Sequence, residues 1–209
     1  MPPPRTAPRL VLASASPARL STLQHAGLNP EVVVSGVDES SVTAETVPAL
    51  AARLAQLKAE AVATSLTRDG EQLLVIGCDS MLELDHEAYG KPGTPDVAAE
   101  RWRRMRGRSG VLHTGHHVVL AGPDARRTRT AVASTTVYFA DLSDAEIEAY
   151  VASGEPLQVA GAFTVDGLGG PFVRGIDGDF HNVVGISLPL LRELLLDLGI
   201  AWPTLWGAS

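Results

Sequence analysis

The sequence of 209 residues contains one cysteine, few aromatic residues and no long apolar run. A single cysteine, Cys78, excludes an intramolecular disulfide and a zinc site built from cysteines, so a reducing cytoplasm is the expected location. No run of 18 or more apolar residues occurs, and no membrane-spanning segment is predicted. The net charge of −7 argues against a protein that binds nucleic acid or an anionic membrane. An anionic ligand would need a local cluster of positive charge, or a metal ion.

The chain is nevertheless rich enough in apolar residues to build a core, since 45% of it is hydrophobic. We expect residues 1–8, which are rich in proline, to form a disordered lead-in. The apolar run at Leu10–Ala13 is too short for a secretory signal. Residues 9–209 are predicted to form a single domain of two lobes around a cleft.

Strand and helix patterns alternate along the whole chain, which predicts an α/β fold. Helix starts are marked by Ser16-Pro17, by Thr94-Pro95 and by the capping box Ser143–Glu146. The remaining helices are expected from Thr46 and over 189–198. Strands are expected over 9–13, 31–35, 72–78, 117–121, 130–139, 162–165 and 171–176, with a hairpin over 81–90. The hairpins make the predicted sheet mixed.

A candidate phosphate site lies where the first strand enters the first helix. Ser14 and Ser16 supply hydroxyl groups there, the helix start presents free N–H groups, and Arg19 lies in the first turn. An ordinary capped helix with a surface arginine has the same pattern.

Asp79 follows the apolar strand 72–78, and a carboxylate at the C-terminal end of a buried strand is a common reactive group in α/β proteins. It could hold Mg²⁺ or polarise an attacking water, or simply cap a turn. Its neighbour Cys78 has no positive partner in sequence, so a buried strand residue is the expected role.

Two lysines and an acidic pair add to these candidates. Lys58 lies beside the apolar stripe of the helix that starts at Thr46, where it could contact a phosphate or extend into solvent. Lys91 follows the hairpin and precedes a proline. Asp38 and Glu39 offer the oxygen ligands that Mg²⁺ prefers, although acidic turns are often only solvated.

Two further patterns carry less. The basic run at 101–108 could bind nucleic acid, but an exposed helix face is the simpler interpretation. His116 and His117 should point to opposite faces of a strand, which disfavours a shared metal site.

Together these stretches resemble the Maf family from about Leu10 to Leu198. The matching stretches are LASASPARL, VDES, LAQLKA, VIGCDS, GKP, SGEPLQVAGAFTVDGLGGPFV and NVVGISLPLL. The resemblance implies an inosine-triphosphatase-like fold and hydrolysis of nucleoside triphosphates to a monophosphate and pyrophosphate, as in the removal of non-standard nucleotides. It also implies a divalent cation, Mg²⁺ or Mn²⁺, and a homodimer. The older naming of the family as septum-formation inhibitors suggests a different function, in cell-division control.

By position, the resemblance makes Asp79 the catalytic proton acceptor. It places Ser14, Arg19, Lys58 and Lys91 at the phosphates, and Asp38 with Glu39 at the acidic pair. With Asp79, that pair forms the predicted metal site. The family also has an acidic residue at Glu155, for which the sequence suggests no role.

The chain departs from the family pattern at several positions, listed here in order: Ala18, Ser80, Gly110, Val159 and Asp166. The family usually has a basic residue where Ala18 stands. Its pyrimidine-preferring members have threonine at Ser80 and glutamine at Asp166. We therefore expect Ser80 and Asp166 to contact the substrate and the base preference to differ from dTTP and UTP. An ionised carboxylate at Asp166 can only accept hydrogen bonds, which favours a donor-rich base edge such as that of guanine or cytosine.

Overall fold

The computed structural model describes residues 8–66, 71–123 and 125–207. Its strands form one seven-stranded mixed sheet of order β2-β1-β3-β5-β6-β7, with β4 paired to β3 outside this series. The two parallel pairs involve β1, and the other pairs are antiparallel. The predicted α/β class with a mixed sheet is confirmed. The predicted lead-in falls almost entirely at positions 1–7, outside the described residues.

The sheet consists of three long strands, β3, β5 and β6, and four short ones. The strands are β1 (Arg9–Leu12), β2 (Glu31–Val32), β3 (Leu73–Leu84), β4 (Glu87–Tyr89), β5 (Ser109–Ala121), β6 (Arg126–Phe139) and β7 (Val173–Asp177). The lengths of several predicted strands are wrong. The strand expected over 72–78 continues to Leu84, the one expected from 117 begins at Ser109, and the one expected over 31–35 ends at Val32.

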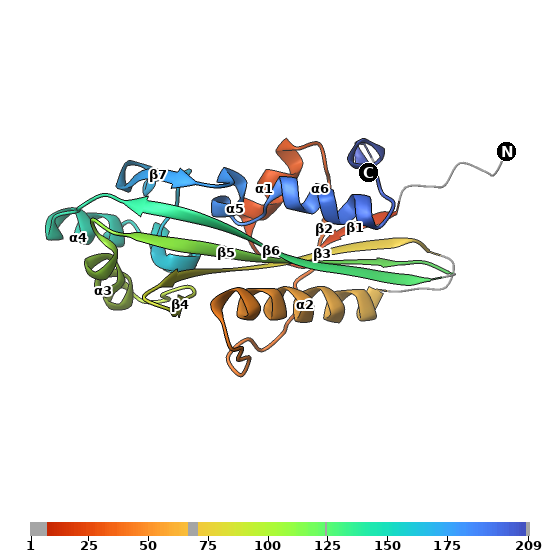
Figure 1. Ribbon diagram of the computed structural model, residues 1–209, viewed down its shortest axis with the longest axis horizontal. Helices are drawn as coiled ribbons and strands as arrows, with labels where there is room; N and C mark the ends of the chain where they lie inside the picture. The colour runs from red at the N-terminus through yellow and green to blue at the C-terminus, as the bar shows by residue number, and fades with distance from the viewer. Residues whose placement is uncertain (1–7, 67–70, 124, 208–209) are drawn as a thin grey trace.

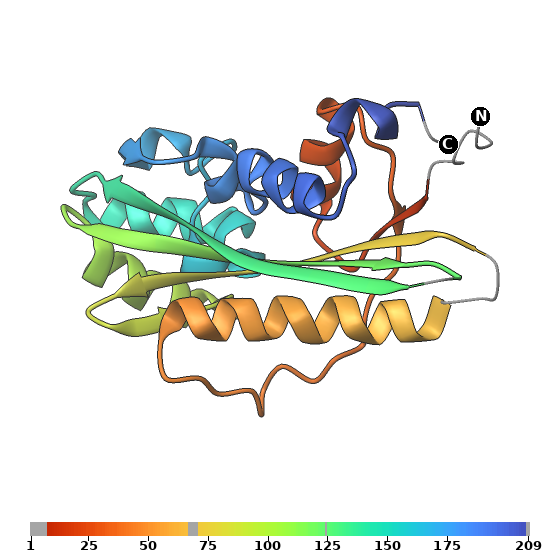
Figure 2. The same ribbon diagram turned by 45° about the vertical axis from the view of Figure 1, so that its right-hand side comes forward.

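Helices cover both faces of the sheet (Figure 1). They are α1 (Pro17–His25), α2 (Val47–Leu66), α3 (Pro95–Met105), α4 (Asp144–Ala152), α5 (Phe180–Val184) and α6 (Leu188–Asp197), with the short 3₁₀ helices η1 (Glu155–Gln158), η2 (Ala160–Ala162), η3 (Gly170–Phe172) and η4 (Trp202–Leu205). The predicted strand over 162–165 is absent, because the chain there leaves η2 and enters a series of turns. Figure 2 shows α2 lying along one face and α6 along the other.

The core divides into three clusters of buried residues. One lies between the sheet and α1 with α6, and contains Leu12, Ile76 and Cys78. A second lies under α2, around Val75 and Ala59. The third surrounds Trp102 of α3 at the other end of the long strands. β3 contributes to all three, so it connects both ends of the molecule; the division into two lobes stays a prediction.

The basic run at 101–108 lies on α3 and the residues that follow it. Trp102 is fully buried, while Arg103 and Arg104 are exposed, so an amphipathic helix face is the better interpretation. Within the described ranges, no helix is both long and apolar enough to cross a membrane.

Candidate functional site

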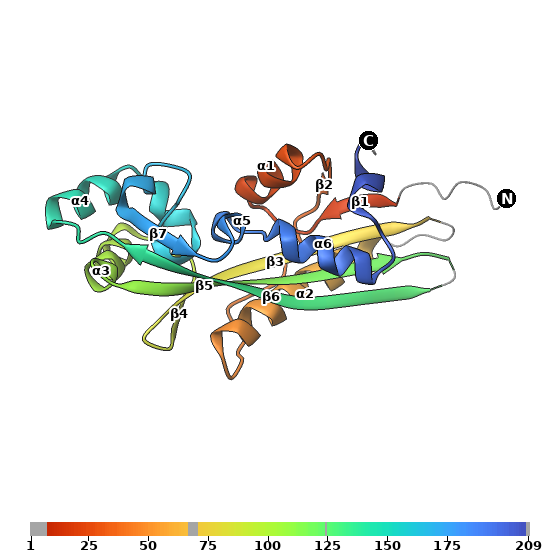
Figure 3. The same ribbon diagram turned by 45° about the horizontal axis from the view of Figure 1, so that its top comes forward.

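The candidate site lies at an interruption in the pairing of β3. On one edge, β1 pairs with Leu73–Ile76 and β4 pairs with Leu82–Leu84, whereas β5 pairs with β3 along the other edge from Leu73 to Glu83 (Figure 3). In the described part of the chain, residues 77–81 therefore have a strand partner on one side only. We name these five residues the open edge of β3. Side chains and loops can approach the strand there.

Asp79 lies in the middle of this open edge. The prediction that it terminates a strand is wrong, because the antiparallel ladder with β5 continues past it, pairing Asp79 with Gly115. Asp79 is nevertheless accessible as a strand-end carboxylate would be. The parallel neighbour β1 ends at Leu12, opposite Ile76, and leaves the edge beside Asp79 without a strand.

Two glycines bring α2 close to Asp79. A Cβ on Gly77 would lie 2.4 Å from the carbonyl oxygen of Ala55, and a Cβ on Gly115 would lie 2.2 Å from that of Ala51. Any side chain at either position would push the helix away from the sheet. The close approach places Lys58 of α2 on the same face of the sheet as Asp79.

Lys58 joins two carboxylates. Its ammonium forms an ion pair with Oδ1 of Asp79 and lies 2.8 Å from Oε1 of Glu39, which belongs to the loop before α2. Lys58 and Asp79 are both more than nine-tenths buried, while Glu39 is exposed. Oδ2 of Asp79 is buried and has no hydrogen-bond partner among the described residues. An unpaired buried carboxylate oxygen is costly, and this one is available to a water, a metal or a substrate.

Arg19 reaches the open edge from the other face of the sheet. It is 8% exposed, so the alternative of a surface arginine is excluded. Its Nε donates to the carbonyl of Gly185 at 2.7 Å, and Nη1 donates to Ser14 Oγ at 3.1 Å and to the Cys78 carbonyl at 2.9 Å. Nη2 donates to Ser80 Oγ at 2.9 Å. Four of its five N–H groups are thus engaged, and the positive charge is held at the open edge, against Cys78 and Ser80.

Sequence reasoning missed the residues that hold this arginine. Thr114 lies opposite Ser80 on β5, with their hydroxyl oxygens 2.9 Å apart, and it donates to the carbonyl of Asn182. The Gly185 carbonyl follows α5. The stretch NVVG was noticed in the sequence, but nothing local indicated that its backbone would accept from Arg19.

Ser16 has a structural role. It is the N-cap of α1, and its hydroxyl accepts from the Arg19 amide at 3.4 Å. Ser14 accepts from the Ser16 amide at 3.2 Å. The predicted start of this helix is confirmed, and the serine turn is ordered before any ligand binds.

We name Asp79 with Lys58 and Glu39 the Asp79 cluster, and Arg19 with Ser14 and Ser80 the Arg19 cluster. Asp166 belongs to neither and lines a cavity of about 630 Å³ between α1 and α5. Ala18, Thr22, Phe180 and His181 also line this cavity. The volume is within the range of small-molecule sites. Because Ala18 precedes Arg19, the cavity begins beside the Arg19 cluster.

Glu155, for which no role is evident from the sequence, holds the bend that carries Asp166. Its carboxylate accepts from Thr164, from the Leu168 amide at 2.9 Å and from the Gly169 amide at 3.0 Å. Burial acts to raise the pKa of this carboxyl, but the hydrogen bonds outweigh it and the pKa is lowered. Glu155 is therefore a structural anion.

Two predicted residues are not gathered into the clusters. The Lys91 side chain is exposed, although the preceding residue, Gly90, lies next to Met81 at the end of the open edge: a Cβ on Gly90 would be 3.4 Å from the Met81 sulfur. Asp38 is exposed, and its Oδ1 accepts from Ser40 at 3.0 Å and 2.7 Å, which lowers the pKa of Asp38. The described residues contain no preformed group of three His, Cys, Asp or Glu side chains that could hold a metal.

Cys78, His116 and His117 are all buried. Burial raises the pKa of the Cys78 thiol to about 12, which excludes a thiolate nucleophile at neutral pH. His116 and His117 do point to opposite faces: His116 Nε2 accepts from the Ser187 amide at 2.9 Å, and His117 contacts Glu60 of α2 at 3.1 Å.

Comparison with known proteins gives one consistent family. Residues 9–198 match the family model described as Maf-like protein. Two relatives are each called nucleoside triphosphate pyrophosphatase. The one from Salinispora tropica is 60% identical over 95% of this chain and 88% of its own length. The one from Streptomyces coelicolor is 57% identical over 99% of this chain and 98% of its own.

A solved structure, the Ham1 protein of Staphylococcus aureus, is similar at 20% identity with a TM-score of 0.40, over 63% of this chain and 72% of that one. The match to the Maf-like model covers the open edge of β3, the Arg19 cluster and the Asp166 cavity together. The chain belongs to the Maf family.

Proposed function

We propose that this protein hydrolyses a nucleoside triphosphate to the monophosphate and pyrophosphate. The observation that carries the proposal is the open edge of β3, where a carboxylate with a free oxygen pairs with a buried lysine on one face and a buried arginine binds the strand from the other face. Asp79 supplies the carboxylate, and Lys58 and Arg19 the positive charge. The relatives named as nucleoside triphosphate pyrophosphatases, of nearly the same length, support the same reaction.

In the proposed mechanism, Oδ2 of Asp79 accepts a proton from the water that attacks the phosphoryl group. The bond between the α and β phosphates breaks, and pyrophosphate leaves with the electron pair of that bond. Lys58 and Arg19 stabilise the negative charge that gathers on the transferring group and on the pyrophosphate. Arg19 acts with a fixed geometry, because its guanidinium is held by hydrogen bonds to Gly185, Ser14 and Ser80. Lys91, at the exposed end of the open edge, adds charge for the outer phosphates.

The residues present fit a divalent cation. Mg²⁺ in enzymes of nucleotides is commonly held by one or two carboxylates together with substrate phosphates. Asp79 has the orphaned oxygen, and Glu39 approaches the same ammonium at 2.8 Å; Asp38 adjoins it on the same loop. A bound Mg²⁺ or Mn²⁺ would supply charge neutralisation on the phosphates.

The cavity beside Ala18 and Asp166 is proposed to hold the base. Its Asp166 carboxylate accepts hydrogen bonds only, which favours the N1–H and N2–H₂ edge of guanine or the amino group of cytosine. Alanine at Ala18 leaves room for a larger or methylated base. We further propose that the enzyme works in the cytoplasm, as a homodimer.

The deciding experiment is a panel of common and modified nucleoside triphosphates with Mg²⁺ or Mn²⁺, in which pyrophosphate and orthophosphate release are measured separately. We expect stoichiometric pyrophosphate with the monophosphate and no accumulation of diphosphate. A chromatogram in which the diphosphate forms first would overturn the proposal and indicate a γ-phosphatase. Removal of the metal with a chelator should abolish turnover, and added Mg²⁺ should restore it.

A further inference from the structure

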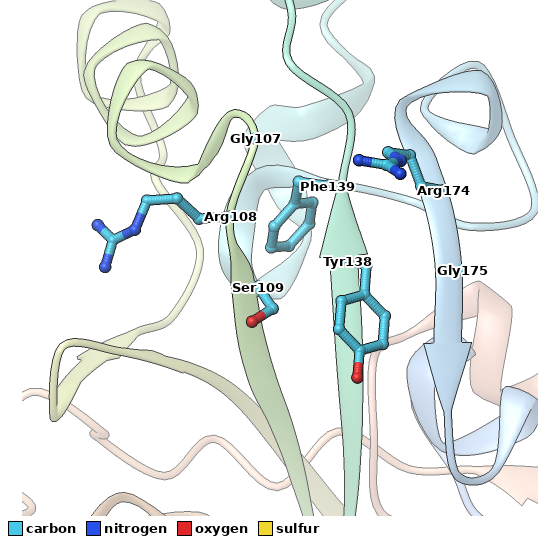
Figure 4. Close-up of a pocket in the computed structure, with 7 residues that line it drawn as sticks. All are labelled: Gly107, Arg108, Ser109, Tyr138, Phe139, Arg174 and Gly175. Carbon is cyan, nitrogen blue, oxygen red and sulfur yellow. The ribbon is translucent and has the colours of Figure 1, made fainter.

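A second cavity lies at the far end of the sheet from Asp79. Its volume is about 350 Å³, and it is lined by β5, β6 and β7 (Figure 4). Ser109, at its floor, is six residues along β5 from Gly115, the partner of Asp79. At about 3.3 Å per residue, the two sites are roughly 20 Å apart. The cavity is therefore separate from the candidate active site.

Tyr138 is the central side chain of this cavity. It pairs with Ser109 on one side and with Gly175 on the other. Both neighbours are small, and a Cβ added at Gly175 would meet no atom within 4 Å. Tyr138 is consequently 44% exposed, although it lies within a sheet. Figure 4 shows it standing between these two neighbours. An aromatic ring with open space beside it is a surface on which another planar ring can stack.

Arg174 supplies an uncompensated positive charge at the same cavity. It is exposed and forms no hydrogen bond or ion pair with any described residue. Arg108 differs, because its Nη1 lies 3.1 Å from Asp85 and its side chain points away from the cavity (Figure 4). Asp141 lies at the opposite lip, where a Cβ on Gly107 would come 3.5 Å from its Oδ1. In a protein of net charge −7, an unpaired arginine beside an exposed aromatic ring provides a local site for a ligand that is both anionic and aromatic.

We propose that this cavity is a second binding site, which takes a planar aromatic ring carrying a phosphate, such as a nucleoside monophosphate. Tyr138 stacks on the base, Arg174 binds the phosphate through charge-assisted hydrogen bonds, and Gly175 leaves the space for the ring. The cavity volume of about 350 Å³ lies at the lower end of the range for small-molecule sites, which suits a ligand of this size. The site is independent of the proposed reaction, because it shares no residue with the Asp79 and Arg19 clusters.

The test uses 3-fluorotyrosine in the full chain, read by fluorine NMR. The protein has three tyrosines, and Tyr89 and Tyr150 are buried, so one resonance reports this cavity and is assigned with Tyr138→Phe. GMP should shift the Tyr138 resonance saturably. Guanosine, which lacks the phosphate, and pyrophosphate, which lacks the base, should each bind about tenfold more weakly or not at all.

Matched variants locate the effect. Arg174→Gln should weaken GMP binding about tenfold, the loss expected for a charge-assisted contact. Arg127→Gln, an exposed arginine on β6 elsewhere in the sheet, is the control for charge and should leave it unchanged. Gly175→Val should remove binding by filling the space, and all three variants should keep wild-type turnover. A Tyr138 resonance that does not respond to about 1 mM GMP, an equal loss in Arg127→Gln, or an equal response to pyrophosphate alone would each overturn the proposal.

Discussion

The close contact between α2 and the sheet predicts that a single methyl group will misplace the active site. In Gly115→Ala, the new Cβ would lie 2.2 Å from the carbonyl oxygen of Ala51. A close carbon–oxygen contact requires about 3.3 Å, so α2 has to move away by roughly 1 Å. Overpacking of this kind costs about 1–3 kcal/mol of stability. Because Lys58 is on α2, the same movement separates it from Asp79, and a 1 Å misplacement can lower turnover by about 100-fold.

The assay pairs urea unfolding with steady-state pyrophosphate release. Gly175→Ala is the matched control, because it adds the same methyl group to a strand glycine with no atom within 4 Å. The control should change stability by no more than about 0.5 kcal/mol and leave kcat/KM unaltered. If Gly115→Ala behaves like this control in both assays, the glycine contact does not position α2. If it is destabilised yet fully active, the distance between Lys58 and Asp79 does not govern the chemistry.

Three more predictions address the chemistry and its conditions. Asp79→Asn should lower kcat by about 100-fold or more without loss of folding, measured by circular dichroism, because a neutral amide cannot accept the proton; near wild-type rates at saturating metal would remove Asp79 from the mechanism. The double variant Ala18→Arg, Asp166→Gln should shift relative activity toward dTTP and UTP, and a wild-type enzyme that already prefers them contradicts the argument. Burial lowers the pKa of His116 to about 4, so the unfolded chain binds more protons than the folded one between pH 6.5 and 4. The free energy of unfolding should therefore fall by about 3 kcal/mol as the pH drops through this window. His116→Gln should flatten this pH dependence, whereas His86→Gln, at an exposed histidine, should not.

Local signals in the sequence predicted the local structure well. The N-cap Ser16 and the capping box of Ser143 with Glu146 are both present as expected, because their hydrogen bonds join residues three apart. The amphipathic character of α3 and the burial of Cys78 followed from the same kind of short-range pattern.

The geometry of the site could not be predicted in this way. Arg19 is buried because it donates to carbonyls 166 and 59 residues away in sequence, at Gly185 and Cys78. The length of β3 was underestimated for a related reason. Asp79 and Ser80 interrupt an apolar run and therefore suggest a turn, whereas the pairing with β5, set by distant residues, continues through them. The residues were identifiable from the sequence, but their arrangement around the open edge was not.

The burial of Cys78 has a practical consequence. Its thiol lies in the apolar core on the opposite face of β3 from Asp79, fully buried, with a pKa raised to about 12. Thiol reagents attack the thiolate, so modification at neutral pH requires the strand segment to detach from its neighbours first. The labelling rate of this one native thiol therefore measures how often the peptide next to Asp79 opens. A nucleotide that binds both Lys58 and Arg19 should slow the labelling of Cys78.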